Sequence, residues 1–178
     1  MKLLYKTKNG DRGFTMIEII AVLIVIGILA AIAVSRSVNY DTEVYTGADA
    51  LKSHLRYAQT RAMNYTYTTA TAPGVWGISG TTNSYWLFEG TTTTNYIRLP
   101  EDDAFINADR TINLTLKKIK LTAGFTIYFD NRGIPYTAYT NATTNTPLST
   151  AMTINVQPLS AATPNIAVTI TPLTGYIQ

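Results

Sequence analysis

The sequence contains no cysteine and a single histidine, His54, and these two scarcities narrow its chemistry. Without thiols the 178-residue chain has no disulfide framework, thiolate zinc site, cysteine nucleophile or lipid-anchored cysteine. Charged residues are also few, at 14%, whereas apolar residues reach 46%. This balance excludes a disordered acidic chain and predicts a packed core, and the length suits one ordinary domain with an appendage.

Positive charge is confined to the first residues. The net charge of +3 arises entirely from Lys2, Lys6, Lys8 and Arg12, offset by Asp11. From Phe14 onward ten basic and ten acidic side chains cancel, and the last 46 residues, 133–178, contain no Lys or Arg. The excess of positive charge therefore gives no support for nucleic-acid binding by the body of the chain.

A long apolar run follows the basic segment. Residues 14–34 are nearly all apolar, with Glu18 as the single charge. A helix rises about 1.5 Å per residue, so this run matches the roughly 30 Å hydrocarbon core of a bilayer. The basic residues before it predict that the N-terminus stays in the cytoplasm and that everything after Val34 lies outside.

The order of these segments differs from that of a secretory signal peptide, whose apolar region precedes the cleavage point. Here a polar leader ends at Gly13, and the apolar run begins at once. The residues from Gly13 to Glu18 (GFTMIE) resemble the cleavage and methylation site of type IV prepilins and pseudoprepilins. The resemblance implies that a prepilin peptidase cuts after Gly13, N-methylates Phe14 and leaves the apolar helix in the mature protein.

Glu18 is itself a functional candidate, because an unpaired carboxylate near the end of a membrane helix costs free energy. Cleavage after Gly13 would create a positive amine at Phe14, one helical turn away. In filaments of the family the equivalent Glu neutralises the N-terminal amine of a neighbouring subunit, which implies an assembly role for Glu18. The alternative is an interfacial carboxylate that contacts only headgroups and water.

The next segment, 35–64, predicts an amphipathic continuation of the same helix, which ends near Asn64. Its apolar residues recur every three or four positions and form a seam: Val44, Ala48, Leu51, Leu55, Ala58 and Ala62. The seam is too short for a coiled coil, so we expect it to pack on the chain's own sheet.

Residues 65–178 predict a β-rich domain, because Thr, Tyr, Asn and Gly dominate and apolar residues alternate with polar ones. Strands are predicted around 75–78, 85–89, 95–99, 125–129, 152–156 and 166–170, with loops at 80–84, 90–94 and 140–150. A turn at 130–133 makes 125–139 a hairpin. Apolar parity changes between Ile112–Leu116 and Ile119–Leu121, which predicts a β-bulge at Lys117 and Lys118.

The predicted fold is therefore α+β, with one long N-terminal helix, half membrane-spanning and half amphipathic, packed on an antiparallel sheet. This is also the pilin-like architecture. Four segments resemble the GspH/FimT group of minor pilins and pseudopilins: LKSHLRYAQTRAM at 51–63, YWLFEG, FDNRGIP and the terminal VTITPLTGYIQ. That likeness implies a low-copy subunit near a filament tip.

Catalytic and metal chemistry have little support in the sequence. His54 lies just off the apolar seam, where we expect a solvent-facing or boundary position, and no nucleophile and base can be paired. Glu101, Asp102, Asp103 and Asp109 form the densest acidic group, but they lack a fixed ligand spacing, and a solvated loop is the preferred interpretation. We therefore predict no enzymatic activity, no cofactor and no metal site.

The sequence thus predicts a structural pilin or pseudopilin subunit of a type IV pilus or type II secretion pseudopilus. The resemblance implies prepilin peptidase, other pilin subunits and an inner-membrane assembly platform as partners. It also implies a single-pass bacterial inner-membrane protein with a periplasmic C-terminal domain. A DNA- or surface-binding minor pilin is the alternative, with phosphate contacts from Lys117, Lys118, Lys120, Arg98 and Arg132. An anchored domain with an uncut leader is a further possibility.

Overall fold

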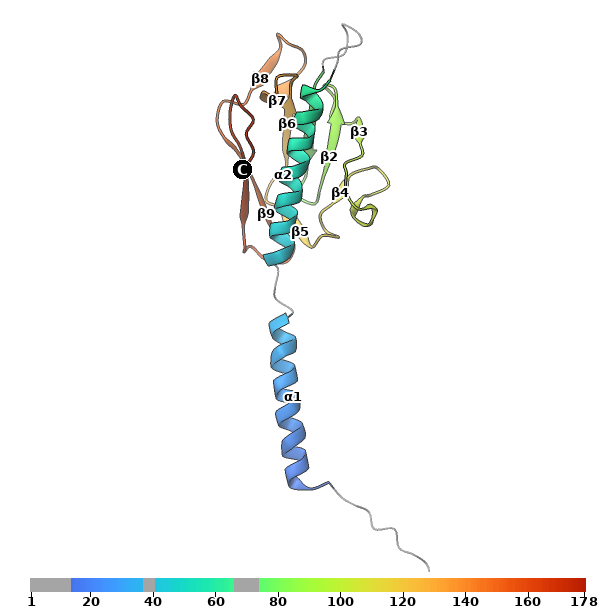
Figure 1. Ribbon diagram of the computed structural model, residues 1–178, viewed down its shortest axis with the longest axis vertical. Helices are drawn as coiled ribbons and strands as arrows, with labels where there is room; N and C mark the ends of the chain where they lie inside the picture. The colour runs from blue at the N-terminus through green and yellow to red at the C-terminus, as the bar shows by residue number, and fades with distance from the viewer. Residues whose placement is uncertain (1–13, 37–40, 66–73) are drawn as a thin grey trace, which may run out of the picture. The chain divides into compact units, whose positions relative to one another are not determined.

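The computed structural model describes residues 14–36, 41–65 and 74–178, and the chain divides into two compact units, Met1–Asn39 and Tyr40–Gln178. The first unit holds helix α1, Met16–Arg36, and the second holds helix α2, Asp41–Met63, with the strands (Figure 1). The predicted continuity of one helix depends on residues 37–40, which lie outside the described residues. The α+β class is confirmed, and the arrangement is pilin-like.

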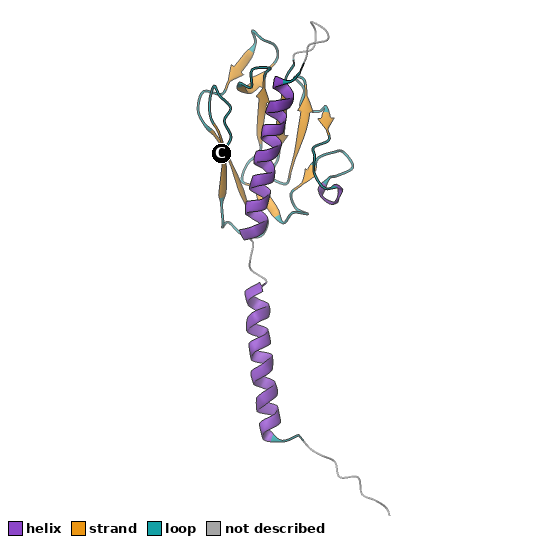
Figure 2. Cartoon of the chain, viewed as in Figure 1, coloured by secondary structure: helices purple, strands orange, loops and turns teal. Residues whose placement is uncertain are grey.

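Two antiparallel sheets make up the second unit (Figure 2). The larger sheet has the order β3-β2-β1-β6-β7-β8, with β4 pairing to β2, and the smaller has the order β10-β9-β5. The strands are β1 Trp76–Gly80, β2 Ser84–Glu89, β3 Tyr96–Ile97, β4 Ile112–Asn113, β5 Ile119–Leu121, β6 Phe125–Phe129, β7 Pro135–Tyr139, β8 Asn145–Pro147, β9 Met152–Pro158 and β10 Ile166–Ile170; a short 3-10 helix, η1, covers Asp103–Phe105.

Helix α2 joins the two sheets into one domain. It contacts β1 and β6 of the larger sheet and β5, β9 and β10 of the smaller one. All six residues of the predicted seam are at most 1% exposed: Val44, Ala48, Leu51, Leu55, Ala58 and Ala62. The prediction that this seam packs on the chain's own β-structure is therefore confirmed, and the helix ends at Met63, next to the predicted boundary.

The strands predicted from alternation are present. β6 and β7 form the predicted hairpin, with Tyr128 opposite Tyr136 and Phe129 opposite Pro135. β9 and β10 pair antiparallel, and their inward residues Ile154, Val156 and Val168 are buried. Strong period-two alternation with one buried face explains why these strands could be recognised from sequence.

Two expectations for the β domain are wrong. Residues 112–121 are not one bulged strand, because β4 lies in the larger sheet and β5 in the smaller, with a turn at 114–118 between them. Asn113 Oδ1 accepts from Thr115 N at 3.0 Å and from Leu116 N at 3.2 Å, and Lys118 adopts a φ of 58°. A side chain that bonds the backbone two residues on favours a turn over continued pairing. Residues 140–150 are not entirely loop, since β8 pairs with β7 there.

The face of the larger sheet that α2 does not cover carries an aromatic cluster. Phe88, Tyr128, Tyr136 and Tyr139 are all buried and pack with Val75. Phe88 and Tyr128 are cross-strand neighbours of Gly77 on either side, with ring centroids 5.0 Å apart in an edge-to-face arrangement. A β-carbon on Gly77 would collide with the Ile127 carbonyl oxygen and with the Phe88 ring, so the missing side chain makes room for both.

Candidate functional site

The described part of the predicted processing and assembly motif begins at Phe14, since Gly13 lies outside the described residues. Phe14 is 79% exposed, and Thr15 precedes the first residue of α1. The Glu18 backbone N–H donates to Thr15 Oγ1 at 3.3 Å and to Thr15 O at 3.0 Å. Thr15 and Glu18 have the Ser/Thr-x-x-Glu spacing of a capping box, so Thr15 acts as the N-cap and Glu18 occupies the third helical position.

Glu18 is exposed in the first turn of α1. A carboxylate there interacts favourably with the positive end of the helix dipole, and its oxygens stay accessible to a further cation. The local structure therefore gives Glu18 a capping position that is compatible with the predicted pairing to an amine. The pairing itself involves a second molecule and stays a prediction.

After Glu18, the described surface of α1 is apolar on every side. Its large apolar side chains are between 49% and 85% exposed from Met16 to Ile32. Neither helix has, within the residues described here, the length and apolarity of a membrane span. A helix that is apolar all round needs cover from other helices or from lipid.

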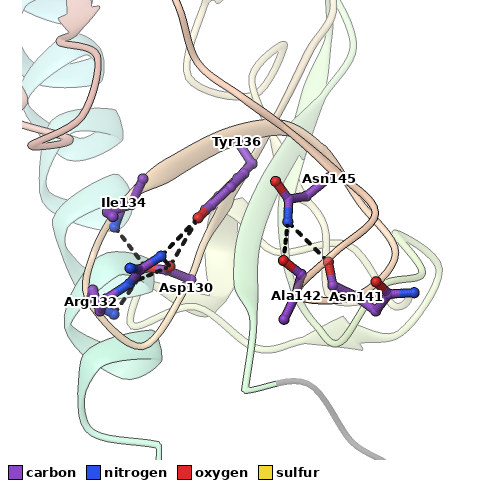
Figure 3. Close-up of polar contacts among 7 residues, drawn as sticks. All are labelled: Asp130, Arg132, Ile134, Tyr136, Asn141, Ala142 and Asn145. Atoms are coloured by element: carbon purple, nitrogen blue, oxygen red, sulfur yellow. Dashed lines mark hydrogen bonds and ion pairs between the residues drawn. The ribbon is translucent and has the colours of Figure 1, made fainter.

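The FDNRGIP hairpin is organised around one buried carboxylate, Asp130, which is 5% exposed (Figure 3). Its Oδ1 accepts from the backbone N–H groups of Arg132 and Ile134, each at 2.9 Å. Its Oδ2 accepts from Arg132 Nη2 at 2.9 Å, from Arg132 Nε at 3.1 Å and from Tyr136 Oη at 3.1 Å. The carboxylate is fully occupied within its own turn, which gives it a structural role.

The hairpin turn and the C-terminal turn, two of the segments that carry the GspH/FimT likeness, meet at Gln59 of α2. Gln59 Nε2 donates to Gly133 O at 2.9 Å and to Thr174 O at 3.2 Å. Gly175 has a φ of 61°, and a β-carbon there would lie 2.7 Å from Gly133 O, so both the conformation and the close approach require glycine. Arg56 adds a bond from Nη2 to Ile177 O at 2.8 Å. These contacts hold the C-terminal segment against α2.

His54 is buried, at 5% exposed, so the expectation of a solvent-facing or boundary position is wrong. Its Nε2 lies 3.4 Å from Pro100 O, which only accepts, so we assign the ring proton to Nε2. Nδ1 then accepts from the Tyr85 hydroxyl at 2.8 Å. Burial is the largest influence on both groups, lowering the pKa of His54 and raising that of Tyr85. A neutral imidazole bound to a neutral phenol is a core hydrogen bond.

Most residues of the predicted cationic cluster already form ion pairs. Lys117 pairs with Glu101 at 2.7 Å, and both side chains are mostly buried. Arg132 pairs with Asp130 at 2.9 Å, and Arg98 pairs with Asp103. Three of the five cations considered for phosphate binding therefore already have anionic partners, which weakens the case for a DNA-binding surface.

The acidic residues at 101–109 also have separate partners. Besides the pairs of Glu101 and Asp103, Asp102 accepts from Ala104 N at 3.0 Å and caps η1. Asp109 accepts from Thr111 Oγ1 at 2.7 Å, and this bond lowers the pKa of Asp109. Among the described residues no three His, Asp or Glu side chains are grouped to hold a metal ion.

The geometry thus defines a pilin-like α+β protein whose N-terminal helix has an apolar, exposed surface among the described residues. Residues 8–34 match the family model described as the prokaryotic N-terminal methylation motif. The match supports a type IV pilin or pseudopilin precursor, and it implies processing by prepilin peptidase and assembly with other pilin subunits. No curated protein and no solved structure shows significant similarity to the chain.

The Asp130 cluster predicts a graded loss of stability. Tyr136→Phe removes one of the donors and should lower the free energy of unfolding by about 1 kcal/mol. Asp130→Ala leaves two backbone N–H groups and the buried Tyr136 hydroxyl without their acceptor, and should lower it by about 2–4 kcal/mol. Urea unfolding monitored by circular dichroism measures both. Equal losses in the two variants would contradict the central role of the carboxylate.

His54 predicts a pH-dependent stability. Because burial lowers the folded-state pKa below the ordinary 6.5, the unfolded chain takes up a proton first as the pH falls. The contribution of neutral His54 to the free energy of unfolding is complete above the pKa of His54 in the unfolded chain. It is lost as the pH falls from there through the pKa of His54 in the folded protein. His54→Gln keeps a polar side chain but removes this titration, so its unfolding midpoint should change less between pH 7.5 and pH 5, roughly the range around the histidine pKa. Urea midpoints at both pH values measure this, and equal pH dependence in both proteins would contradict it.

Proposed function

We propose that this chain is a minor pilin or pseudopilin, of the GspH/FimT kind, in a type IV pilus or a type II secretion pseudopilus. The observation that carries the proposal is the methylation motif at 8–34, which includes most of α1. In this proposal residues 1–13 are a cytoplasmic leader removed after Gly13, and Phe14 becomes the methylated N-terminus. Residues 14–34 insert in the inner membrane and later pack in the filament core, while the domain from 65 onward faces the periplasm.

The described side chains support a mechanical role. The apolar surface of α1 is exposed within its own unit, whereas the second unit buries the apolar seam of α2 against its sheets. Three ion pairs involve six of the twelve charged side chains in residues 65–178. Such a division suits a subunit that polymerises through its N-terminal helix and carries a self-contained domain. Glu18 is the proposed assembly residue, since its carboxylate is exposed one turn from the amine that cleavage at Gly13 would create.

Cleavage is the first test. We expect the full chain, expressed with an active prepilin peptidase, to lose residues 1–13 and to begin with N-methylated Phe14. Intact mass and N-terminal sequencing of the membrane-extracted protein measure this, with a catalytically inactive peptidase as the control. If the leader persists with the active enzyme, the chain is an ordinary anchored domain and the proposal is wrong.

Assembly is the second test, and it must separate pairing by Glu18 from capping by Thr15. Glu18→Ala should be cleaved normally but should lose at least about tenfold in recovery from sheared filaments, because a buried amine is left unpaired. Thr15→Val removes the Oγ1 acceptor of the Glu18 N–H while leaving the carboxylate, and recovery should stay near that of the unmodified chain. Equal losses in both variants would assign the effect to helix capping instead.

A further inference from the structure

A hollow of about 290 Å³ lies within the second unit at the C-terminal end of α2. Arg61, Asn64 and Tyr65 line it from the helix and the residues just after it, and Trp76 and Glu89 line it from β1 and β2. Trp76 and Glu89 are directly opposite one another in the β1–β2 ladder, so their side chains are neighbours on one face of the sheet. A hollow of this size has room for one small ring.

The indole N–H of Trp76 has no acceptor among the described residues. Trp76 is 3% exposed, and its Nε1 is buried without a hydrogen-bond partner. The other tryptophan, Trp86, donates its Nε1 to Thr93 O at 2.7 Å. An unpaired buried donor costs about 1–3 kcal/mol, and buried tryptophans normally find a partner. Trp76 lines the hollow, so a ligand whose acceptor reaches this N–H would remove the cost.

The charges at the hollow are balanced. The Arg61 guanidinium lies 4.5 Å from the centroid of the Trp76 ring, a cation–π contact that holds it at the site. Neither Arg61 nor Glu89 forms an ion pair with another described residue. Because these opposite charges cancel, the described lining suits a ligand without net charge that accepts from Arg61 and donates to Glu89.

We propose that this hollow binds one hexose-sized ring of a saccharide. A hydroxyl group both donates and accepts, so neighbouring hydroxyls on one ring satisfy the indole N–H, the guanidinium and the carboxylate without adding net charge. Asn64, whose Nδ2 donates to Thr60 O at 3.0 Å, keeps its side-chain oxygen for a further hydroxyl. This site is separate from the methylation motif, and its existence does not depend on filament assembly.

The experiment uses the full-length chain in a detergent without a sugar head group. Trp86→Phe leaves Trp76 as the single tryptophan, so its fluorescence reports on the hollow. Methyl glucoside, methyl galactoside and N-acetylglucosamine are the probes, and glycine is the zwitterionic control. We expect a saturable change with at least one sugar, with a Kd on the order of 1–10 mM for a single ring.

Two variants assign the binding to this site. Trp76→Phe keeps an aromatic ring but removes the N–H, and Glu89→Gln removes the carboxylate charge. Each should weaken sugar binding at least about tenfold by ligand-observed NMR, while Trp86→Phe should bind like the unmodified chain. Circular dichroism checks that every variant is folded, and Glu89→Gln keeps the test valid if Trp76→Phe unfolds.

Three results would overturn the proposal. The first is the absence of saturable binding by all three sugars, and the second is saturation by glycine alone, which would assign the hollow to a zwitterion. The third is unchanged sugar binding in both Trp76→Phe and Glu89→Gln, which would place the sugar elsewhere. None of these results bears on cleavage after Gly13, so the two proposals fail separately.

Discussion

The β domain depends on the burial of one face of α2. The larger sheet presents β1 and β6 to this helix, and the smaller presents β5, β9 and β10, so the helix supplies the surface on which both sheets close. Leu51 and Leu55 lie at the centre of the seam and are almost completely buried. Each buried leucine contributes roughly 1.5–3 kcal/mol of hydrophobic free energy, so this seam contributes substantially to holding the two sheets together. The remaining contacts of α2 fix its neighbours in place.

Polar contacts then convert this hydrophobic association into a definite geometry. Arg56 and Gln59 lie on the flank of the buried seam and bond carbonyl oxygens of the C-terminal segment and of the hairpin turn. Carbonyls at turns need donors when water is excluded, and a helix side chain that supplies the donor also fixes where the turn lies. The Asp130 cluster acts in the same way within its hairpin, because a satisfied buried carboxylate tolerates few alternative arrangements.

Much of this fold could be predicted from the sequence, and the exceptions have physical causes. The helical seam and the strands near 125, 152 and 166 were recognisable because burial imposes a strict period on the chain. The turn at 114–118 gives the same change of parity as a bulge, and only the pairing of β4 and β5 with different sheets distinguishes the two. The burial of His54 was missed because its partner, Tyr85, lies 31 residues away in sequence, on β2. The ion pairs of Lys117 and Arg98, and the unpaired N–H of Trp76, likewise depend on tertiary contacts that no local pattern encodes.

The distribution of satisfied polar groups bears on what kind of protein this is. An active site needs side chains whose hydrogen-bonding or ionic capacity is held open for a substrate, whereas Asp130, His54 and Lys117 each have that capacity filled by neighbours. Two described exceptions have a buried side-chain atom without a partner: Trp76 Nε1 and Glu43 Oε2, and each residue lines a hollow on the domain. Glu43 lines its hollow with Lys117, which Glu101 already neutralises, so the described lining offers a carboxylate but no cation without an ion-pair partner. Among the described residues, the Trp76 hollow combines an unpaired donor with a cation and a carboxylate that have no ion-pair partner, and for that reason it is the better-equipped recognition site of the two.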